Sequence, residues 1–213
     1  MPIDADDLMA LLPPLDPAPG PELVGAGTAD GLRFTGLELT GDATGGRFLE
    51  CVLEDCDLAG ASFDRARFTS CRLSAMRATA WSLADATLLD VVLTGGRLGA
   101  LTGHGSGLTR VRLQDLKVDF LDLASAALVD VTFVGCTIGE LDLTSADLRD
   151  VRFAGCTVES LVLDGTRCRD VDLRGAEIVR LDGVAGLRGT TISSVQVTGW
   201  APALAAELGI AVG

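Results

Sequence analysis

Every fifth residue of this chain is apolar, in unbroken phase, from Phe48 to Ile178. Of the 27 positions in this series, 24 are Leu, Phe, Ile or Val, and the exceptions are Ala78, Gly103 and Cys168. An α-helix repeats every 3.6 residues and a strand every two, so neither produces this spacing. The period is an internal repeat, and it predicts a fold built from stacked structural units.

The residue two positions before each central apolar residue is also mostly apolar or small, whereas the other three positions are largely Asp, Arg, Thr, Ser or Gly. Two side chains of every five therefore point inward, as in a short strand segment followed by a turn. Like residues recur every twenty positions, as in the series Val91, Val111, Val131, Val151 and Val171. Because twenty residues make four repeats, we expect an all-β solenoid with four faces per coil, its coils about 4.8 Å apart.

The repeat phase slips by one residue near each end of the array, at residues 41–46 and 183–186. We expect the solenoid to continue through both slips and to occupy residues 32–199, with Leu187, Ile192 and Val197 as the last central residues. That length corresponds to about eight coils.

Both ends of an open solenoid need caps, because unpaired strand edges invite pairing with other chains. At the N-terminal end, residues 1–31 are expected to form a cap and lead-in. Asp4 would cap a short helix, and Pro13 and Pro14 would end it before a proline-rich stretch. The apolar residues of that helix are Leu8, Met9, Leu11 and Leu12.

At the C-terminal end, residues 200–213 are expected to form a short helix that Gly209 ends. Trp200, Leu204, Leu208 and Ile210 make this segment too apolar for a free tail. Two interpretations stay open: these side chains plug the last coil, or they pack against a second copy of the chain.

The net charge of −13 is unevenly distributed, with −7 in residues 1–46 and −5 in residues 47–199. The repeat region lacks the basic patch that direct nucleic-acid binding requires. No stretch approaches the roughly 18 apolar residues of a membrane span, and no signal peptide is recognised. We therefore expect a cytoplasmic protein with no membrane association. Arginine outnumbers lysine by 16 to 1, which indicates a GC-rich bacterial genome.

One of the four expected faces carries acidic residues with only Arg65 to balance them. An unneutralised acidic face could attract the cationic groove of a partner protein. The simpler interpretation, which we favour, is that Asp just before the central residue hydrogen-bonds its own turn. The acidic residues of this candidate interaction face are Asp64, Asp85, Asp122, Asp142, Asp164 and Asp182.

Little in the sequence supports catalysis. The chain has one histidine and no tyrosine, and nothing matches a phosphate loop or a catalytic triad. We expect no enzymatic activity and no cofactor. His104 follows Gly103 at a vacated central position, where we expect Trp81 to fill the gap; a ligand site at His104 is the alternative.

The six cysteines occupy inward positions without a CxxC motif, so we expect no zinc site. Buried reduced thiols are the favoured interpretation for a cytoplasmic chain. The alternative is a disulfide, because Cys51 and Cys71, like Cys136 and Cys156, are expected to stack one coil apart.

Residues 146–150, Ala-Asp-Leu-Arg-Asp, form an A(D/N)LXX unit, and residues 136–140 form a looser one. Over roughly residues 32–199 the chain resembles the pentapeptide-repeat proteins. The resemblance implies a right-handed quadrilateral β-helix. Its best-understood members protect DNA gyrase from quinolones by mimicking duplex DNA, and they are dimers joined through a C-terminal helix.

The chain departs from those members in its weakly charged repeat region and in the absence of a long insertion. We therefore expect a non-enzymatic protein-interaction module with an unknown protein partner, and a possible homodimer through the C-terminal helix. The alternative is a DNA-mimicking protein that binds gyrase or another type II topoisomerase and confers quinolone tolerance.

Overall fold

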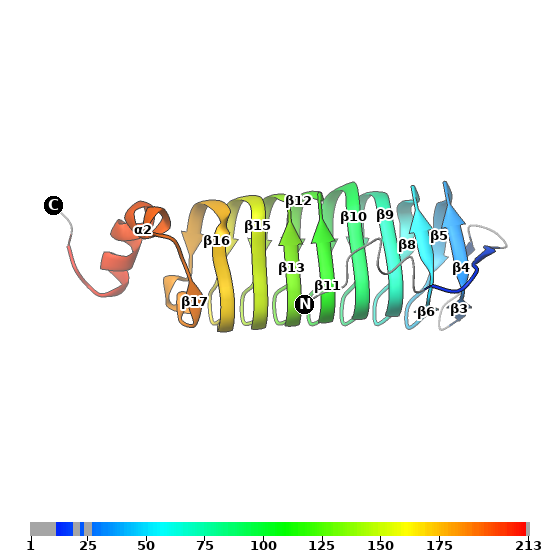
Figure 1. Ribbon diagram of the computed structural model, residues 1–213, viewed down its shortest axis with the longest axis horizontal. Helices are drawn as coiled ribbons and strands as arrows, with labels where there is room; N and C mark the ends of the chain where they lie inside the picture. Colours follow the sequence, from blue (N-terminus) through cyan, green and yellow to red (C-terminus); the bar gives the residue numbers. More distant parts are fainter. Residues whose placement is uncertain (1–11, 19–21, 24–26, 212–213) are drawn as a thin grey trace.

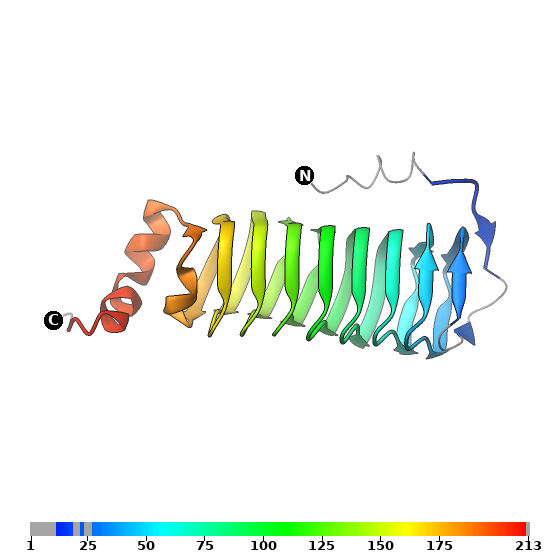
Figure 2. The same cartoon turned by 90° about the horizontal axis from the view of Figure 1, so that it is seen from below.

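Successive coils of the chain lie side by side along one axis, and a helix follows the last coil (Figures 1 and 2). The computed structural model describes residues 12–18, 22–23 and 27–211. Its strands form one parallel β-solenoid of about eight turns, which confirms the expected fold class. In the central coils each residue pairs with the residue twenty positions later, as Leu88 does with Leu108 and Leu108 with Leu128.

The strands vary from two to sixteen residues, because some continue around a corner of the coil. They are β1 (Asp16–Pro17), β2 (Glu22–Leu23), β3 (Thr28–Asp30), β4 (Leu32–Thr35), β5 (Glu38–Asp42), β6 (Arg47–Leu49), β7 (Val52–Glu54), β8 (Asp57–Ser62), β9 (Arg67–Ser82), β10 (Thr87–Thr102), β11 (Gly107–Gln114), β12 (Lys117–Asp122), β13 (Ala127–Val134), β14 (Thr137–Asp142), β15 (Asp147–Val162), β16 (Arg167–Asp182) and β17 (Thr190–Thr191). A short 3-10 helix, η1 (Val184–Leu187), and an α-helix, α2 (Ser194–Glu207), complete the described chain.

The corners of the coils depend on residues in the left-handed backbone region. Among the described residues, every non-glycine residue with a positive φ lies two positions after a central residue, as do Asp85 (φ 55°) and Ser125 (φ 57°). Asp and other short polar residues tolerate this conformation better than branched residues do. The recurrence of Asp, Ser and Gly at this position therefore follows from backbone geometry.

Inward side chains fill the solenoid along its length. The central residues from Phe48 to Leu163 are almost all buried, and like side chains stack on like. The rings of Phe48 and Phe68 stack with centroids 4.6 Å apart, as do those of Phe133 and Phe153. Such stacks bury large apolar areas between neighbouring coils, and this burial stabilises the solenoid, in which each coil contacts only the coils next to it.

The N-terminal phase slip is confirmed. Phe34 pairs with Leu53, and Ala29 with Phe48, both nineteen residues apart instead of twenty. The expected lead-in needs a correction, because β1, β2 and β3 pair with β4, β5 and β6. The parallel ladder thus begins before residue 32. The expected helix over Leu8, Met9 and Leu11 lies outside the described residues.

At the C-terminal end the coil is incomplete. Leu187 and Ile192 still pack against the core, as the sequence predicts. The prediction for Val197 is wrong, because α2 already begins at Ser194, six residues before the expected start at Trp200, and leaves Val197 45% exposed. The cause is a capping box: Ser193 Oγ accepts from Gln196 N, and Gln196 Oε1 accepts from Ser193 N.

Candidate interaction surface

The outward side chains form four faces that differ sharply in charge. We number the four faces in chain order. The first face has Phe48 and every twentieth residue after it as central residues, and the second, third and fourth faces begin in the same way with Leu53, Leu58 and Phe63. Between residues 47 and 182 the first two faces each carry equal numbers of acids and bases, and the third has one excess acid. The fourth face carries six acids and one base, so it accounts for nearly all of the net charge of the solenoid.

We call this fourth face the acidic face, and its acids are the six predicted: Asp64, Asp85, Asp122, Asp142, Asp164 and Asp182. The structure aligns Asp122 and Asp142 as direct neighbours on β12 and β14. At the spacing of paired strands, about 4.8 Å, such like charges repel each other. Asp85 differs from the other acids, because it lies at a corner of the coil, where the backbone has a positive φ that Asp tolerates.

Several of these carboxylates bond to the backbone, as the simpler interpretation predicts. One oxygen of Asp122 accepts a hydrogen bond from Ala124 N at 2.9 Å, and Asp142 accepts one from Thr144 N at 2.8 Å. Asp64 reaches the next coil and accepts from Ala84 N and from the hydroxyl of Ser82. These bonds stabilise the turns, but they neutralise none of the charge.

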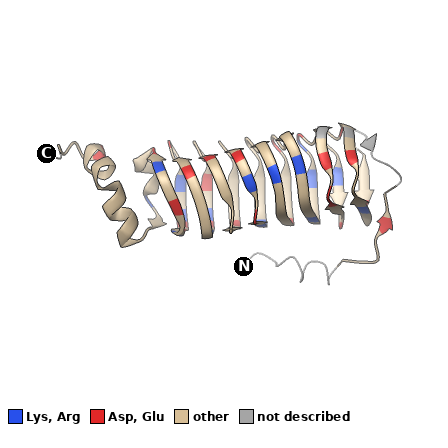
Figure 3. Ribbon diagram, turned by 90° about the horizontal axis from the view of Figure 1, so that it is seen from above, with Lys and Arg blue, Asp and Glu red and all other residues tan. Residues whose placement is uncertain are grey.

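No carboxylate of the acidic face takes part in an ion pair within the described residues. The other faces contrast with it, because Arg110 pairs bidentately with Asp90 at 2.6 and 2.7 Å, and Arg152 pairs with Asp150 at 2.8 Å. Figure 3 shows acidic and basic residues interspersed along the coils. The acidic face is thus locally hydrogen-bonded and electrostatically unpaired.

The predicted C-terminal contact residues divide into two groups. Trp200 is buried and Leu204 is half-buried, whereas Leu208 and Ile210 are 74% and 55% exposed. The inner pair is therefore covered by other parts of the single chain. The outer pair contacts solvent in the single chain.

Gln196 holds α2 against the last coil. Its side-chain amide donates to the carbonyl oxygens of Leu173 and Ala176, at 2.8 and 2.9 Å. Sequence reasoning missed this residue, although the spacing of Ser193 and Gln196 is a recognisable capping-box signal.

The cysteines are free thiols, and five of the six are buried. Cys136 Sγ, for example, donates to the carbonyl oxygen of Leu113 at 3.4 Å. Cys168 is the half-buried exception, and burial raises its pKa to about 11. No group of three or more possible metal ligands occurs among the described residues.

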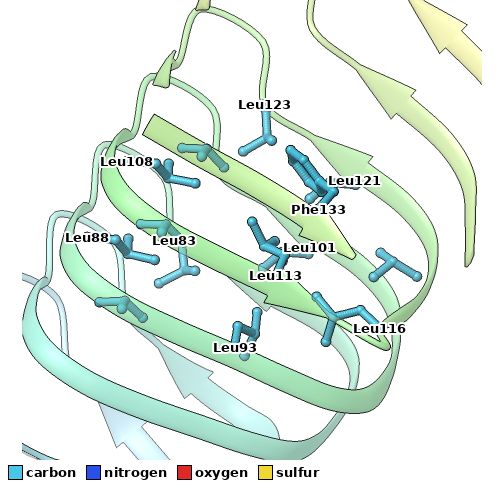
Figure 4. Close-up of a cluster of buried hydrophobic side chains, with 14 of the residues drawn as sticks. Leu83, Leu88, Leu93, Leu101, Leu108, Leu113, Leu116, Leu121, Leu123 and Phe133 are labelled. Carbon is cyan, nitrogen blue, oxygen red and sulfur yellow. The ribbon is translucent and has the colours of Figure 1, made fainter. Parts of the chain in front are cut away.

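His104 is exposed in a turn, and the expected filling of the neighbouring gap needs a correction. A closed apolar cavity of about 30 Å³ remains beside Gly103, lined by leucines that include Leu83, Leu101 and Leu123 (Figure 4). Trp81 is buried but does not line this cavity; its ring meets that of Phe63 edge-on instead. Leu83, on the same coil as Trp81, borders this space instead.

Within the described part of the chain, none of the helices has the length and apolar character needed to cross a membrane.

The four-faced parallel ladder defines the class of the protein, a β-solenoid repeat protein. A family model of pentapeptide repeats, describing eight copies, matches residues 42–74. This match confirms the resemblance to pentapeptide-repeat proteins seen in the sequence. No curated protein matches it.

Solved structures of similar proteins include two pentapeptide-repeat proteins. HetL, involved in heterocyst differentiation regulation in the cyanobacterium Nostoc sp. strain PCC 7120, has 17% identity and a TM-score of 0.41, over 78% of this chain and 90% of HetL. QnrB1, a plasmid-mediated fluoroquinolone resistance protein, has 17% identity and a TM-score of 0.39, over 89% of this chain and all of the trypsin-treated QnrB1 chain.

Proposed function

We propose that the protein is a non-enzymatic, cytoplasmic interaction module that binds a cationic surface of a partner protein through its acidic face. The observation that supports this proposal is the concentration of unpaired charge. The acidic face carries six carboxylates without an ion pair among the described residues, while several arginines on the other faces, such as Arg110, Arg152 and Arg174, pair with nearby acids. Unpaired surface charge of one sign steers association with a partner of the opposite sign.

The shape of the molecule fits binding better than catalysis. Inward side chains fill the interior, and the closed cavity beside Gly103 holds only about 30 Å³. Sites for small-molecule substrates typically enclose about 300–1,000 Å³. The outer surface is therefore where this chain can act.

The second candidate is a DNA-mimicking protein that binds gyrase or another type II topoisomerase. The in-register carboxylates of Asp122 and Asp142 favour it, because they place like charges in a row along the solenoid axis. Duplex DNA, however, carries one charge per about 1.7 Å of its axis, a much denser array than the single carboxylate, at most, that this face carries per coil of about 4.8 Å. We therefore rank this function second.

Charge reversal tests the first candidate. In a triple variant, Asp122→Lys, Asp142→Lys and Asp164→Lys reverse the acidic face. The matched control, Glu50→Lys, Glu140→Lys and Glu177→Lys, makes the same change in net charge on the first and third faces. Chemical crosslinking in an extract of the source cells identifies the partner. The proposal predicts a crosslinked protein that the acidic-face variant loses and the control variant retains.

Loss in both variants, or in neither, would contradict a role for the acidic face. A gyrase supercoiling assay with and without a quinolone separates the two candidates. Protection of supercoiling that disappears in the acidic-face variant would support the DNA mimic. No effect at micromolar protein would exclude it.

We also propose that the chain forms a homodimer through α2 and the residues that follow it. The support is the exposure of Val197, Leu208 and Ile210, whereas Trp200 is buried within the single chain. Exposed apolar side chains on this segment are the surface that such a dimer would bury.

A further inference from the structure

An open groove of about 430 Å³ lies on the first face, near the C-terminal end of the solenoid. Val129, Arg149 and Arg169 follow one another along one outward row of β13, β15 and β16. Asp147 and Arg167 belong to the other outward row, across the inward-facing residues between them. The volume of the groove is within the range of small-molecule sites.

The charges that line the groove are not balanced. Arg167 engages both oxygens of Asp147, at 2.6 and 2.5 Å, so this acid is already paired. Arg149 and Arg169 lie directly opposite each other on neighbouring strands. Neither has an ion pair or side-chain hydrogen bond within the described residues. Two like charges in this arrangement repel each other, and an anion between them would relieve the repulsion.

A second groove, on the third face, shows what a balanced groove looks like. It holds about 380 Å³ and is lined by Arg77 and Arg97, but also by Asp57 and Asp119. Arg77 pairs with Asp55 besides. The groove on the first face has no free acid in its lining, and this difference singles it out.

The rest of the lining is apolar. Val129 is 38% exposed, and Ala127 and the buried Leu148 lie beside it. Cys168 contributes a half-buried thiol whose pKa burial raises to about 11, so it adds no negative charge at neutral pH. The groove therefore presents two free guanidinium groups next to an apolar surface.

We propose that this groove binds the phosphate group of a small organic phosphomonoester. A phosphomonoester carries close to two negative charges at pH 7, which matches Arg149 and Arg169. Guanidinium groups bind phosphate oxygens through paired, charge-assisted hydrogen bonds. A monocarboxylate offers one charge and satisfies one arginine. Val129 and Ala127 provide a surface for the organic part of the ligand.

Phenyl phosphate is a suitable probe, because it combines the phosphate with a small apolar group. Calorimetry measures its binding to the full chain and to a double variant, Arg149→Gln with Arg169→Gln. The matched control, Arg174→Gln with Arg180→Gln, removes two arginines from the second and third faces. Thermal unfolding verifies that all proteins are folded. We expect the first variant to bind at least tenfold more weakly and the control to bind like the wild type.

Two further measurements make the test specific. Benzoate has the same ring with a single charge, and we expect it to bind at least tenfold more weakly than phenyl phosphate. Cys168 is the one accessible thiol, so phenyl phosphate is expected to slow its alkylation by N-ethylmaleimide several-fold. The proposal is overturned by an absence of saturable binding at millimolar phenyl phosphate, by equal losses in both double variants, by equally tight binding of benzoate, or by unprotected alkylation of Cys168.

Discussion

Gln196 Nε2 donates a hydrogen bond to the carbonyl oxygen of Ala176, twenty residues earlier in the chain. The last coil pairs nineteen residues apart, as Val171 does with Thr190, so the Gln196 amide reaches the preceding coil one position out of the strand register. Its second bond, to Leu173 O, spans 23 residues, as does the bond from the Thr166 hydroxyl to Leu143 O within the solenoid. The helix thus closes the edge of the ladder with a side-chain amide in place of a further strand.

The closing role of Gln196 is testable by substitution. In Gln196→Ala the carbonyl oxygens of Leu173 and Ala176 lose their donor, and unfolding should become easier by about 1–3 kcal/mol. Urea denaturation measures this change. Gln114→Ala removes an amide that bonds only to outward side chains, and we expect it to change stability by less than about 0.5 kcal/mol. Equal effects of the two substitutions would contradict the closing role.

The cavity beside Gly103 predicts that alanine stabilises the fold at Gly103 but destabilises it at Gly99. A Cβ at Gly103 would meet Leu123 Cδ2 at 3.0 Å and Ser106 Oγ at 3.1 Å, and Leu123 borders the empty space into which it can move. Gly103→Ala should therefore stabilise the fold by about 0.5 kcal/mol, through the entropy of the unfolded chain and the filled volume.

Gly99→Ala is the matched control, because its Cβ would meet the backbone oxygen of Thr79 at 2.4 Å, and a strand cannot shift as a side chain does. We expect this change to destabilise the fold by more than about 1 kcal/mol. Melting temperatures of the two variants provide the comparison. Destabilisation of similar size in both would show that the space beside Gly103 is not available to a methyl group.

The ion pair between Asp147 and Arg167 predicts a dependence of stability on pH. Hydrogen bonding to Arg167 lowers the pKa of Asp147 below its ordinary value. The stability that this pair contributes is therefore fully present above the unfolded-state pKa, about 3.9, and is lost as the pH falls through the lower folded-state value. Asp147→Asn should make the acid limb of the stability curve shallower, as measured by urea unfolding between about pH 2 and 6. An unchanged acid limb would contradict the contribution of this pair.

The split between buried and exposed C-terminal residues sharpens the test of the dimer. Leu208→Glu with Ile210→Glu should convert a dimer to a monomer in sedimentation analysis while leaving the melting temperature of the solenoid nearly unchanged, because both side chains are exposed in the single chain. Trp200→Ala should destabilise the end of the solenoid by about 3 kcal/mol, since Trp200 is buried within the chain. A double variant that sediments like the wild type would count against an interface at Leu208 and Ile210.

Much of the fold could be predicted because the five-residue period reports directly which side chains point inward. The slip at Phe34 was predictable for the same reason, since nineteen-residue pairing displaces the apolar positions by one. The strands of the lead-in were not, because Asp16–Pro17 and Thr28–Asp30 pair through the backbone and carry no apolar period. Pro17 also argued against a strand there, because proline has no backbone N–H to donate, although an edge strand tolerates it.

The sequence predicted which charged residues lie on each face, but not which of them form ion pairs and hydrogen bonds. The twenty-residue period places Asp122 and Asp142 on one face, and the structure confirms that they are neighbours. Their bonds to Ala124 and Thr144 depend on turn geometry, and the free state of Arg149 and Arg169 depends on which acids other arginines reach. Those are properties of side-chain conformation, which periodicity does not report.

The most direct test of the central claim is the affinity of the identified partner as a function of salt, measured for the wild type, the acidic-face triple variant and its matched control. If the acidic face binds a cationic surface, the wild type and the control should bind with equal affinity and weaken equally as salt rises. The acidic-face variant should bind at least tenfold more weakly at low salt, with a much smaller salt dependence. Equal affinities and equal salt dependences for all three proteins would contradict the account.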